Sequence, residues 1–458
     1  MLSNEELKTE QVSTTPLFAS ALITSLGYVV VQLDVTIVNV ALPTFAQVFN
    51  AGISSLQWIP DAYVVVFAAL LLAAGGLGDR FGNRTVNLLG IGIFLLASLA
   101  CAFSSSIETM IFGRLLQGLG AALIVPSSLA MLSFACGNNP LLRAKAIGWW
   151  SAMGGIISAA GPFIGAIVLT HISWHALFLI NIPICAAGLI LTFFYIPEST
   201  AYNSLNIDTK GILLFVIACF SMIYVMIQFG KSFSVSRDEI LFFGLFVLAL
   251  LFLIVHLAKS KYAFLPVSLL KKPAFSLSLL LAAAMNFSFY GSLFLLTVYF
   301  QVYRGFTPVM TGLALLTFTV IAFANTLSGY LATRFGPRFT LTLGILLASL
   351  NYFILATLTY LDAAFSTFVC FLFLMPIGGG IATPTLLSTF LHQAPAGKTA
   401  TASAAINTMR QTGSAIGVAL LGLLVTGIHF PVGIGATIGF VTAALMMLGG
   451  ALLVSRLA

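Results

Sequence analysis

Long stretches of apolar residues alternate with short polar loops along most of this chain. A helix needs about 20 apolar residues to cross the hydrocarbon core of a bilayer, and we identify fourteen such stretches. The pattern therefore predicts an all-α polytopic membrane protein with fourteen transmembrane helices. The predicted spans lie at 17–45, 57–77, 85–105, 107–133, 144–170, 174–196, 209–230, 239–258, 273–301, 309–332, 338–360, 363–390, 399–428 and 431–455.

The composition favours a membrane protein over a soluble one. Of the 458 residues, 60% are hydrophobic and only 7% are charged, too few polar groups to cover a soluble globule. The net charge of +7 does not indicate nucleic-acid binding, because the basic residues occur singly between apolar stretches. The five cysteines lack CxxC spacing and the histidines are scattered, so we expect no metal and no cofactor. A GxxxxGK[ST] phosphate loop is missing as well, which argues against ATP hydrolysis and against an enzyme.

The basic residues also predict the orientation of the chain. With the N-terminus in the cytoplasm, fourteen of the 19 Lys and Arg residues lie on that side, and only Lys231, Arg237 and Arg304 lie outside. Cytoplasmic loops carry an excess of Lys and Arg, so we predict that both termini are cytoplasmic. The first span is about twice as long as a signal-peptide core and is expected to remain in the protein.

Two distant loops have similar sequences, since RFGNR at 80–84 recurs as RFGPR at 334–338. Such a repeat indicates two homologous segments with the same membrane orientation. The predicted organisation is a cytoplasmic tail at 1–16, a six-helix bundle at 17–200, an inserted helix pair at 207–258 and a second six-helix bundle at 273–458.

Two charged residues lie inside predicted spans at comparable depth. Asp34 is about eleven residues below the outer end of the first span, and Arg114 is about seven below the outer start of the fourth. Burial disfavours an ionised carboxylate whereas a nearby guanidinium favours it, so a small change in distance or hydration can load or release a proton. We predict that Asp34 and Arg114 couple proton movement; the alternative is a purely structural ion pair.

Two further charges have less certain roles. Asp61 follows Trp58, an aromatic residue suited to the outer interface, so we expect a hydrated residue at the mouth that either attracts cations or only faces water. Arg410 lies about a dozen residues inside the thirteenth span, where Asn407 and Gln411 could satisfy its hydrogen bonds. Structural and functional roles stay equally open for Arg410.

Glycines and charges gather around the two repeated loops. Gly82 allows a tight turn, and the mixed charges suit a cytoplasmic latch that opens and closes with conformation; the alternative is a basic turn that only sets topology. The gating candidates are Gly75, Asp79, Arg80, Gly82, Arg84, Arg334, Gly336 and Arg338. In the fifth span, Gly161, Pro162 and Gly165 predict a kinked surface on which a neighbouring helix packs.

Taken in order, these motifs resemble those of the major facilitator superfamily, specifically its fourteen-span drug:proton antiporter family. The resemblance covers nearly the whole chain, and the span-five motif is the one that marks exporters in that family. Thr333 stands where the second loop often has an acidic residue, so we expect a weaker second latch. The matching segments are 33–43, 75–84, 114–122, 161–166, 299–312 and 407–417.

The resemblance implies a major facilitator fold and a multi-pass plasma-membrane protein, in a bacterium the inner membrane. It also implies a monomer that exports lipophilic, cationic drugs in exchange for protons by alternating access, with or without accessory efflux partners. The expected substrate contacts are Asp34, Asp61, Asn286 and Tyr290, although a lipid-facing position is the alternative for the aromatic residues. Two other functions stay open: export of an endogenous metabolite such as a siderophore, lipid or amino-acid derivative, and a non-transporting membrane sensor.

Overall fold

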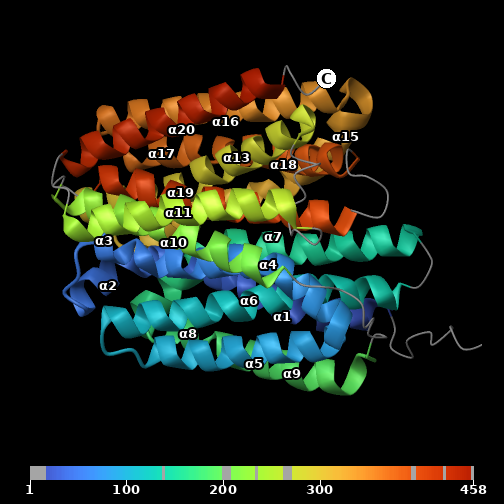
Figure 1. Ribbon diagram of the computed structural model, residues 1–458. Helices are drawn as coiled ribbons and strands as arrows, with labels where there is room; N and C mark the ends of the chain where they lie inside the picture. Colours follow the sequence, from blue (N-terminus) through green and yellow to red (C-terminus); the bar gives the residue numbers. More distant parts are fainter. Residues whose placement is uncertain are drawn as a thin grey trace, which may run out of the picture.

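The computed structural model describes residues 17–136, 140–198, 208–232, 236–260, 271–392, 399–425 and 430–454. Within these ranges the chain is helical and contains no strand. Figure 1 shows the long helices running in roughly the same direction, side by side. The all-α class predicted from the sequence is confirmed for the described residues.

The helices follow the predicted segments of the chain. The first segment contains α1 (Leu17–Ile37), η2 (Val38–Ala41), α2 (Leu42–Val48), α3 (Ile53–Leu56), α4 (Trp58–Phe81), α5 (Asn83–Ala102), α6 (Ile107–Ala135), α7 (Pro140–His171), α8 (Ala176–Leu179) and α9 (Asn181–Tyr195). The inserted pair is α10 (Thr209–Ser232) and α11 (Arg237–Lys259). The last segment contains α13 (Pro273–Val298), η3 (Tyr299–Tyr303), α14 (Pro308–Leu315), η4 (Leu316–Val320), α15 (Ile321–Phe335), α16 (Pro337–Tyr360), α17 (Phe365–Leu372), α18 (Leu374–His392), α19 (Thr399–Leu424) and α20 (Val432–Val454).

Eleven helices or runs of helices in the described residues are long and apolar enough to cross a membrane. Each of them falls on a predicted span, so the membrane-spanning class is confirmed. The other three predicted spans coincide with α4, α7 and α19, of which α4 and α7 contain the shorter apolar helices Trp58–Leu71 and Ala160–His171. The number of fourteen crossings stays a prediction.

Local sequence signals account for several helix boundaries. Ser106 begins α6 with a capping box completed by Thr109, in which each side chain bonds to the backbone N–H of the other. Gly82 and Gly336 separate consecutive helices at φ of +88° and +86°, a conformation that favours glycine. These two glycines lie in the two repeated loops, so the repeat seen in the sequence is also a repeat of backbone geometry.

The first and last segments meet along a seam where α4 packs on α19 and α7 packs on α14. Gln57 donates through Nε2 to the carbonyl oxygens of Val418 (3.4 Å) and Ala419 (3.2 Å). Gln301 donates through Nε2 to the carbonyl oxygen of Val40, at 2.9 Å. Gln57 and Gln301 lie at the end of the molecule opposite the start of α1, so hydrogen bonds across the seam hold that end closed.

The inserted helices α10 and α11 pack against each other, and α10 contacts both α4 and α19. In Figure 1 the pair, drawn in yellow-green, lies in front of the boundary between the first and last segments. The inserted pair therefore covers part of the seam.

Candidate functional site

The two charged residues predicted at similar depth are in direct contact. Arg114 on α6 donates through Nη1 to Oδ2 of Asp34 on α1. The two side chains expose only 1% and 0% of their surface. Arg114 is held further by Nε, which donates to the carbonyl oxygen of Ile59 at 3.0 Å, and by the ring of Tyr63, whose centroid lies 4.4 Å from Cζ. A charge at this depth in a membrane helix is costly without such partners.

Three more polar side chains complete the surroundings of the Asp34 carboxylate. Its Oδ1 accepts from Nδ2 of Asn181 on α9 at 2.9 Å and from Nε2 of Gln117 on α6 at 3.0 Å. Ser98 on α5 accepts from the same two amides, at 3.2 Å from Asn181 and 2.9 Å from Gln117. Gln117 Oε1 in turn accepts from Arg114 Nη1 at 2.8 Å. Residues of α1, α5, α6 and α9 thus form one buried network, which we call the Asp34 network.

This arrangement is suited to holding the carboxylate in its charged form. Both oxygens accept hydrogen bonds, one of them from a guanidinium, and each of the five side chains is buried. A neutral carboxyl would be a poorer acceptor and would leave the guanidinium without a counter-charge. Binding and release of a proton at Asp34 therefore changes the contacts between four helices.

Our sequence analysis did not single out Gln117, Asn181, Ser98 or Tyr63. Gln117 follows Arg114 by three positions and so lies on the same helix face, which is a signal that could have been used. Asn181 and Ser98 come from other helices, and the sequence contains no information on how those helices are rotated.

Asp61 lies in α4 with no exposed surface, and neither carboxylate oxygen has a hydrogen-bond partner. The expectation of a hydrated residue at the mouth is therefore wrong for this conformation. Asp61 lies four residues after Gln57, which bonds across the seam to α19, and residues at this spacing share a helix face. An unpaired buried carboxylate is stable only when it is neutral or when a cation joins it.

Arg410 lies on α19 near the Asn286 and Tyr290 positions of α13. Its Nη1 donates to Oδ1 of Asn407 at 3.4 Å, whereas its buried Nε has no partner. Arg410 and Asn286 line a small pocket of about 10 Å³, and Tyr290 makes an edge contact with Phe289. Gln411 is partly exposed beside Arg410. The structure thus brings Asn286 close to Arg410 but places neither beside Asp34.

The first repeated loop is anchored to the end of α9. Glu198 accepts from the backbone N–H of Arg84 at 3.1 Å and from Thr85 Oγ1 at 2.8 Å. The Arg84 guanidinium donates to the carbonyl oxygen of Phe193 and lies over that ring. Glu198 was absent from our gating candidates, although its negative charge at the start of α5 suits the positive end of a helix dipole.

The other gating candidates make fewer contacts. Arg80 is exposed and lies over the ring of Phe81, and Gly75 has open space around it. The side chain of Asp79 lies outside the described residues. In the second loop, Arg334 donates through Nη1 to the hydroxyl of Tyr330 at 2.5 Å, and Arg338 is exposed. Contacts of Arg80, Arg84 and Arg334 that the structure shows stay within their own segments of the chain.

The span-five motif packs against the helix that carries Asp34. A Cβ on Gly165 would lie 2.8 Å from the carbonyl oxygen of Ile37, and a Cβ on Gly161 would lie 2.0 Å from Thr36 Oγ1. The helix continues through Pro162, whose carbonyl oxygen lies 3.0 Å from the Cβ position of Gly312 on α14. The motif therefore places α1, α7 and α14 in close contact, next to the Asp34 network.

Comparisons with known proteins agree on the type of molecule. A family model described as Major Facilitator Superfamily matches residues 24–418. The chain is 34% identical to the methylenomycin A resistance protein of Streptomyces coelicolor, over 94% of this chain and 90% of that protein. It is 32% identical to the tetracenomycin C resistance and export protein of Streptomyces glaucescens, over 87% of this chain and 74% of that protein. Among solved structures, a D-xylose–proton symporter superposes with a TM-score of 0.67 at 14% identity, covering 94% of this chain and 97% of the other.

Proposed function

We propose that this chain, which belongs to the Major Facilitator Superfamily, exports lipophilic drug-like compounds in exchange for protons by alternating access. The curated relatives named above are resistance and export proteins for antibiotics, which supports the export of drugs. The proposed architecture is the one predicted from the sequence: fourteen spans, two six-helix bundles around an inserted pair, and both termini in the cytoplasm of a bacterial cell.

The Asp34 network is the observation that carries the proton-coupling part of this proposal. Asp34 is fully buried and its charged form is stabilised by Arg114, Gln117 and Asn181. Protonation removes the ion pair between α1 and α6, and so weakens the contact that holds these helices together. In a membrane the network is a place where a proton can be bound in one conformation and released in another.

The conformation supports an assignment of the closed end. The hydrogen bonds from Gln57 and Gln301 across the seam lie at the end opposite the start of α1. With a cytoplasmic N-terminus, that end is the outer one. In our proposal these contacts break when the transporter opens outward, and the Arg84–Glu198 loop acts as a clamp within the first segment.

For the substrate we propose a lipophilic cation, on the basis of Asp61. This carboxylate is buried without a partner next to the seam, and it becomes available when α4 and α19 separate. Proton and cation would then compete for the same group. A second candidate, a lipophilic anion, is favoured by Arg410, whose guanidinium has no acidic partner among the described residues and whose Nε lacks any partner.

Transport by purified protein in liposomes tests the proposal. Ethidium serves as the cationic probe and 8-anilinonaphthalene-1-sulfonate as the anionic one, each with and without an imposed pH gradient. We expect gradient-driven ethidium movement that Asp34→Asn abolishes and that Asp238→Asn, a change at an exposed acid on α11, leaves intact.

The outcomes separate the parts of the proposal. Movement that survives Asp34→Asn would show that Asp34 is not the coupling group. Movement of the anion alone, lost in Arg410→Gln and retained in Asp61→Asn, would establish the second candidate. Failure of both probes to move under any gradient would redirect the search to an endogenous metabolite or to a sensor without transport.

A further inference from the structure

The inserted helices enclose an apolar cavity against the seam. It has a volume of about 240 Å³ and is lined by residues of α4, α10, α11 and α19. Among the lining residues only Thr412 carries a hydroxyl; the others include Ala68, Ala218, Met222, Leu253 and Ile416. An apolar cavity of about 150 Å³ already stays dry and binds benzene. This cavity therefore accepts hydrocarbon and rejects water.

The cavity lies at the depth of a lipid chain. Phe215 and Met222 follow Lys210 by five and twelve residues on α10, which corresponds to roughly 8 and 18 Å along the helix. On α11, Leu253 lies six residues before Lys259, or roughly 9 Å. One leaflet of the hydrocarbon core is about 15 Å thick. A chain that starts near the two lysines thus reaches the cavity within its length.

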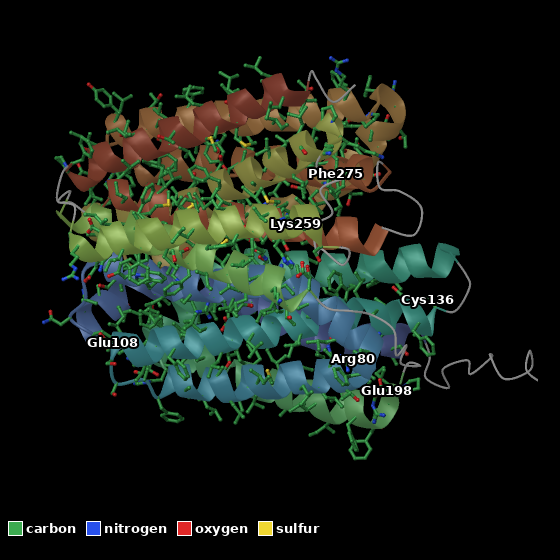
Figure 2. The ribbon with its side chains drawn as sticks, in the orientation of Figure 1. Arg80, Glu108, Cys136, Glu198, Lys259 and Phe275 are labelled. Atoms are coloured by element: carbon green, nitrogen blue, oxygen red, sulfur yellow. The ribbon has the colours of Figure 1, made fainter. Side chains whose placement is uncertain are left out.

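Basic residues are present at the level where the headgroup would lie. Lys210 and Lys259 are exposed in the terminal turns of α10 and α11, and Figure 2 shows Lys259 at the end of its helix. The two helix ends are held together by Asp208, whose Oδ1 lies 2.6 Å from Nε2 of His256. Two ammonium groups on adjoining helix ends favour an anionic headgroup.

The outer side of the inserted pair faces the bilayer. Large apolar side chains cover the exposed surface of α11, including Leu248, Phe252 and Ile254. Leu250, which lines the cavity, is itself 38% exposed. Lipid chains therefore have access to the cavity from the side, without passing through the centre of the transporter.

We propose that this cavity is a binding site for one acyl chain of an anionic phospholipid whose headgroup lies at Lys210 and Lys259. The bound chain packs on α10 and α11 and, at the same time, on α4 and α19. It thereby fastens the inserted pair to both sides of the seam. The site is separate from the Asp34 network and does not depend on which substrate is exported.

Photo-crosslinking of the full-length protein in nanodiscs tests this site. The probe is phosphatidylglycerol with a diazirine in the middle of one acyl chain, and the comparison lipid is phosphatidylethanolamine with the same chain. We expect adducts on residues 215–223 and 246–253, with phosphatidylglycerol preferred by about fivefold or more. Replacing both lysines with glutamine should remove the preference but keep the adducts.

Variants that fill the cavity show whether it is the site. Ala218→Phe should abolish the adducts, whereas Ala258→Phe, at an exposed position of α11, should leave them unchanged. If Ala218→Phe is not monodisperse and as thermally stable as the parent, Ala218→Leu takes its place. Adducts that are insensitive to filling would overturn the proposal. So would cavity labelling by a diazirine-bearing naphthalene when the phospholipid fails to label, because the site would then belong to free lipophiles.

Discussion

Removing either member of the Asp34–Arg114 pair should destabilise the protein in different ways. Asp34→Asn leaves a guanidinium that keeps its charge at every accessible pH, in a site with about 1% exposed surface. Arg114→Gln leaves a carboxylate, which can bind a proton and become neutral. The two variants remove the same ion pair but differ in how the remaining group can respond.

The size of the difference depends on pH. Breaking a buried pair by removing one partner costs about 3–5 kcal/mol, and for Asp34→Asn we expect this loss at both pH 5 and pH 8. Protonating an ordinary aspartate costs about 1.5 kcal/mol at pH 5, which limits the loss in Arg114→Gln at that pH. At pH 8 the same proton would cost more than the lost pair, so the full 3–5 kcal/mol is expected. The Arg114→Gln variant takes up a proton on folding at low pH, and its stability therefore falls as pH rises.

Thermal unfolding of the purified variants measures these values. At roughly 2–4 °C per kcal/mol, Asp34→Asn should lose about 6–20 °C at both pH values, and Arg114→Gln about 3–6 °C at pH 5. The double variant Asp34→Asn/Arg114→Gln should regain most of the stability but no proton-driven efflux. Equal losses in the two single variants at pH 5, or a double variant that loses their sum, would refute the reasoning.

Three further changes have defined outcomes. Gly165→Ala, which places a Cβ 2.8 Å from a carbonyl oxygen of α1, should cost about 1–3 kcal/mol, whereas Gly155→Ala on the same helix, with nothing within 4 Å, should match the parent in thermal unfolding. Asn181→Leu should lower proton-driven efflux about 10–100-fold at normal expression, because the carboxylate loses a donor worth roughly 1.5–3 kcal/mol; an unchanged rate would exclude Asn181 from the coupling site. Gln301→Ala should loosen the closed end and increase the population that is open there, which distance measurements between spin labels on η2 and η3 would detect; an unchanged distance distribution would contradict this role for the hydrogen bond. Glu198→Gln should leave the fold intact, since a charge at an exposed helix start contributes only about 0.3–1 kcal/mol, and reduced transport in that folded variant would support the clamp.

Several parts of the site could be predicted because they depend on local sequence. The depth of Asp34 and Arg114 follows from counting residues along apolar stretches, and the structure places them in contact. The turn at Gly82 follows from the loop sequence and is present at φ of +88°. The coupling role of the pair stays a prediction that the efflux experiment tests.

Other parts depend on how helices are rotated against one another. Asp61 was expected in water, because its distance from Trp58 placed it near an interface, but packing of α4 on α19 covers it completely. The Arg84 loop was expected to be a latch, and the structure adds Glu198 from the end of α9 as its partner. Neither contact has a signature in the sequence, since each joins elements that lie far apart along the chain.

The sequence by itself determined that this is a helical membrane protein, where its helices lie and which charges they carry into the membrane. These properties follow from hydropathy and from the cost of burying a charge, and both can be evaluated along one helix at a time. Only the tertiary structure decided that Gln117, Asn181 and Ser98 surround Asp34, and that α10 and α11 leave a cavity over the seam. The register and rotation of packed helices are set by the fit of side chains from many distant positions at once, and that fit exists only in the folded chain.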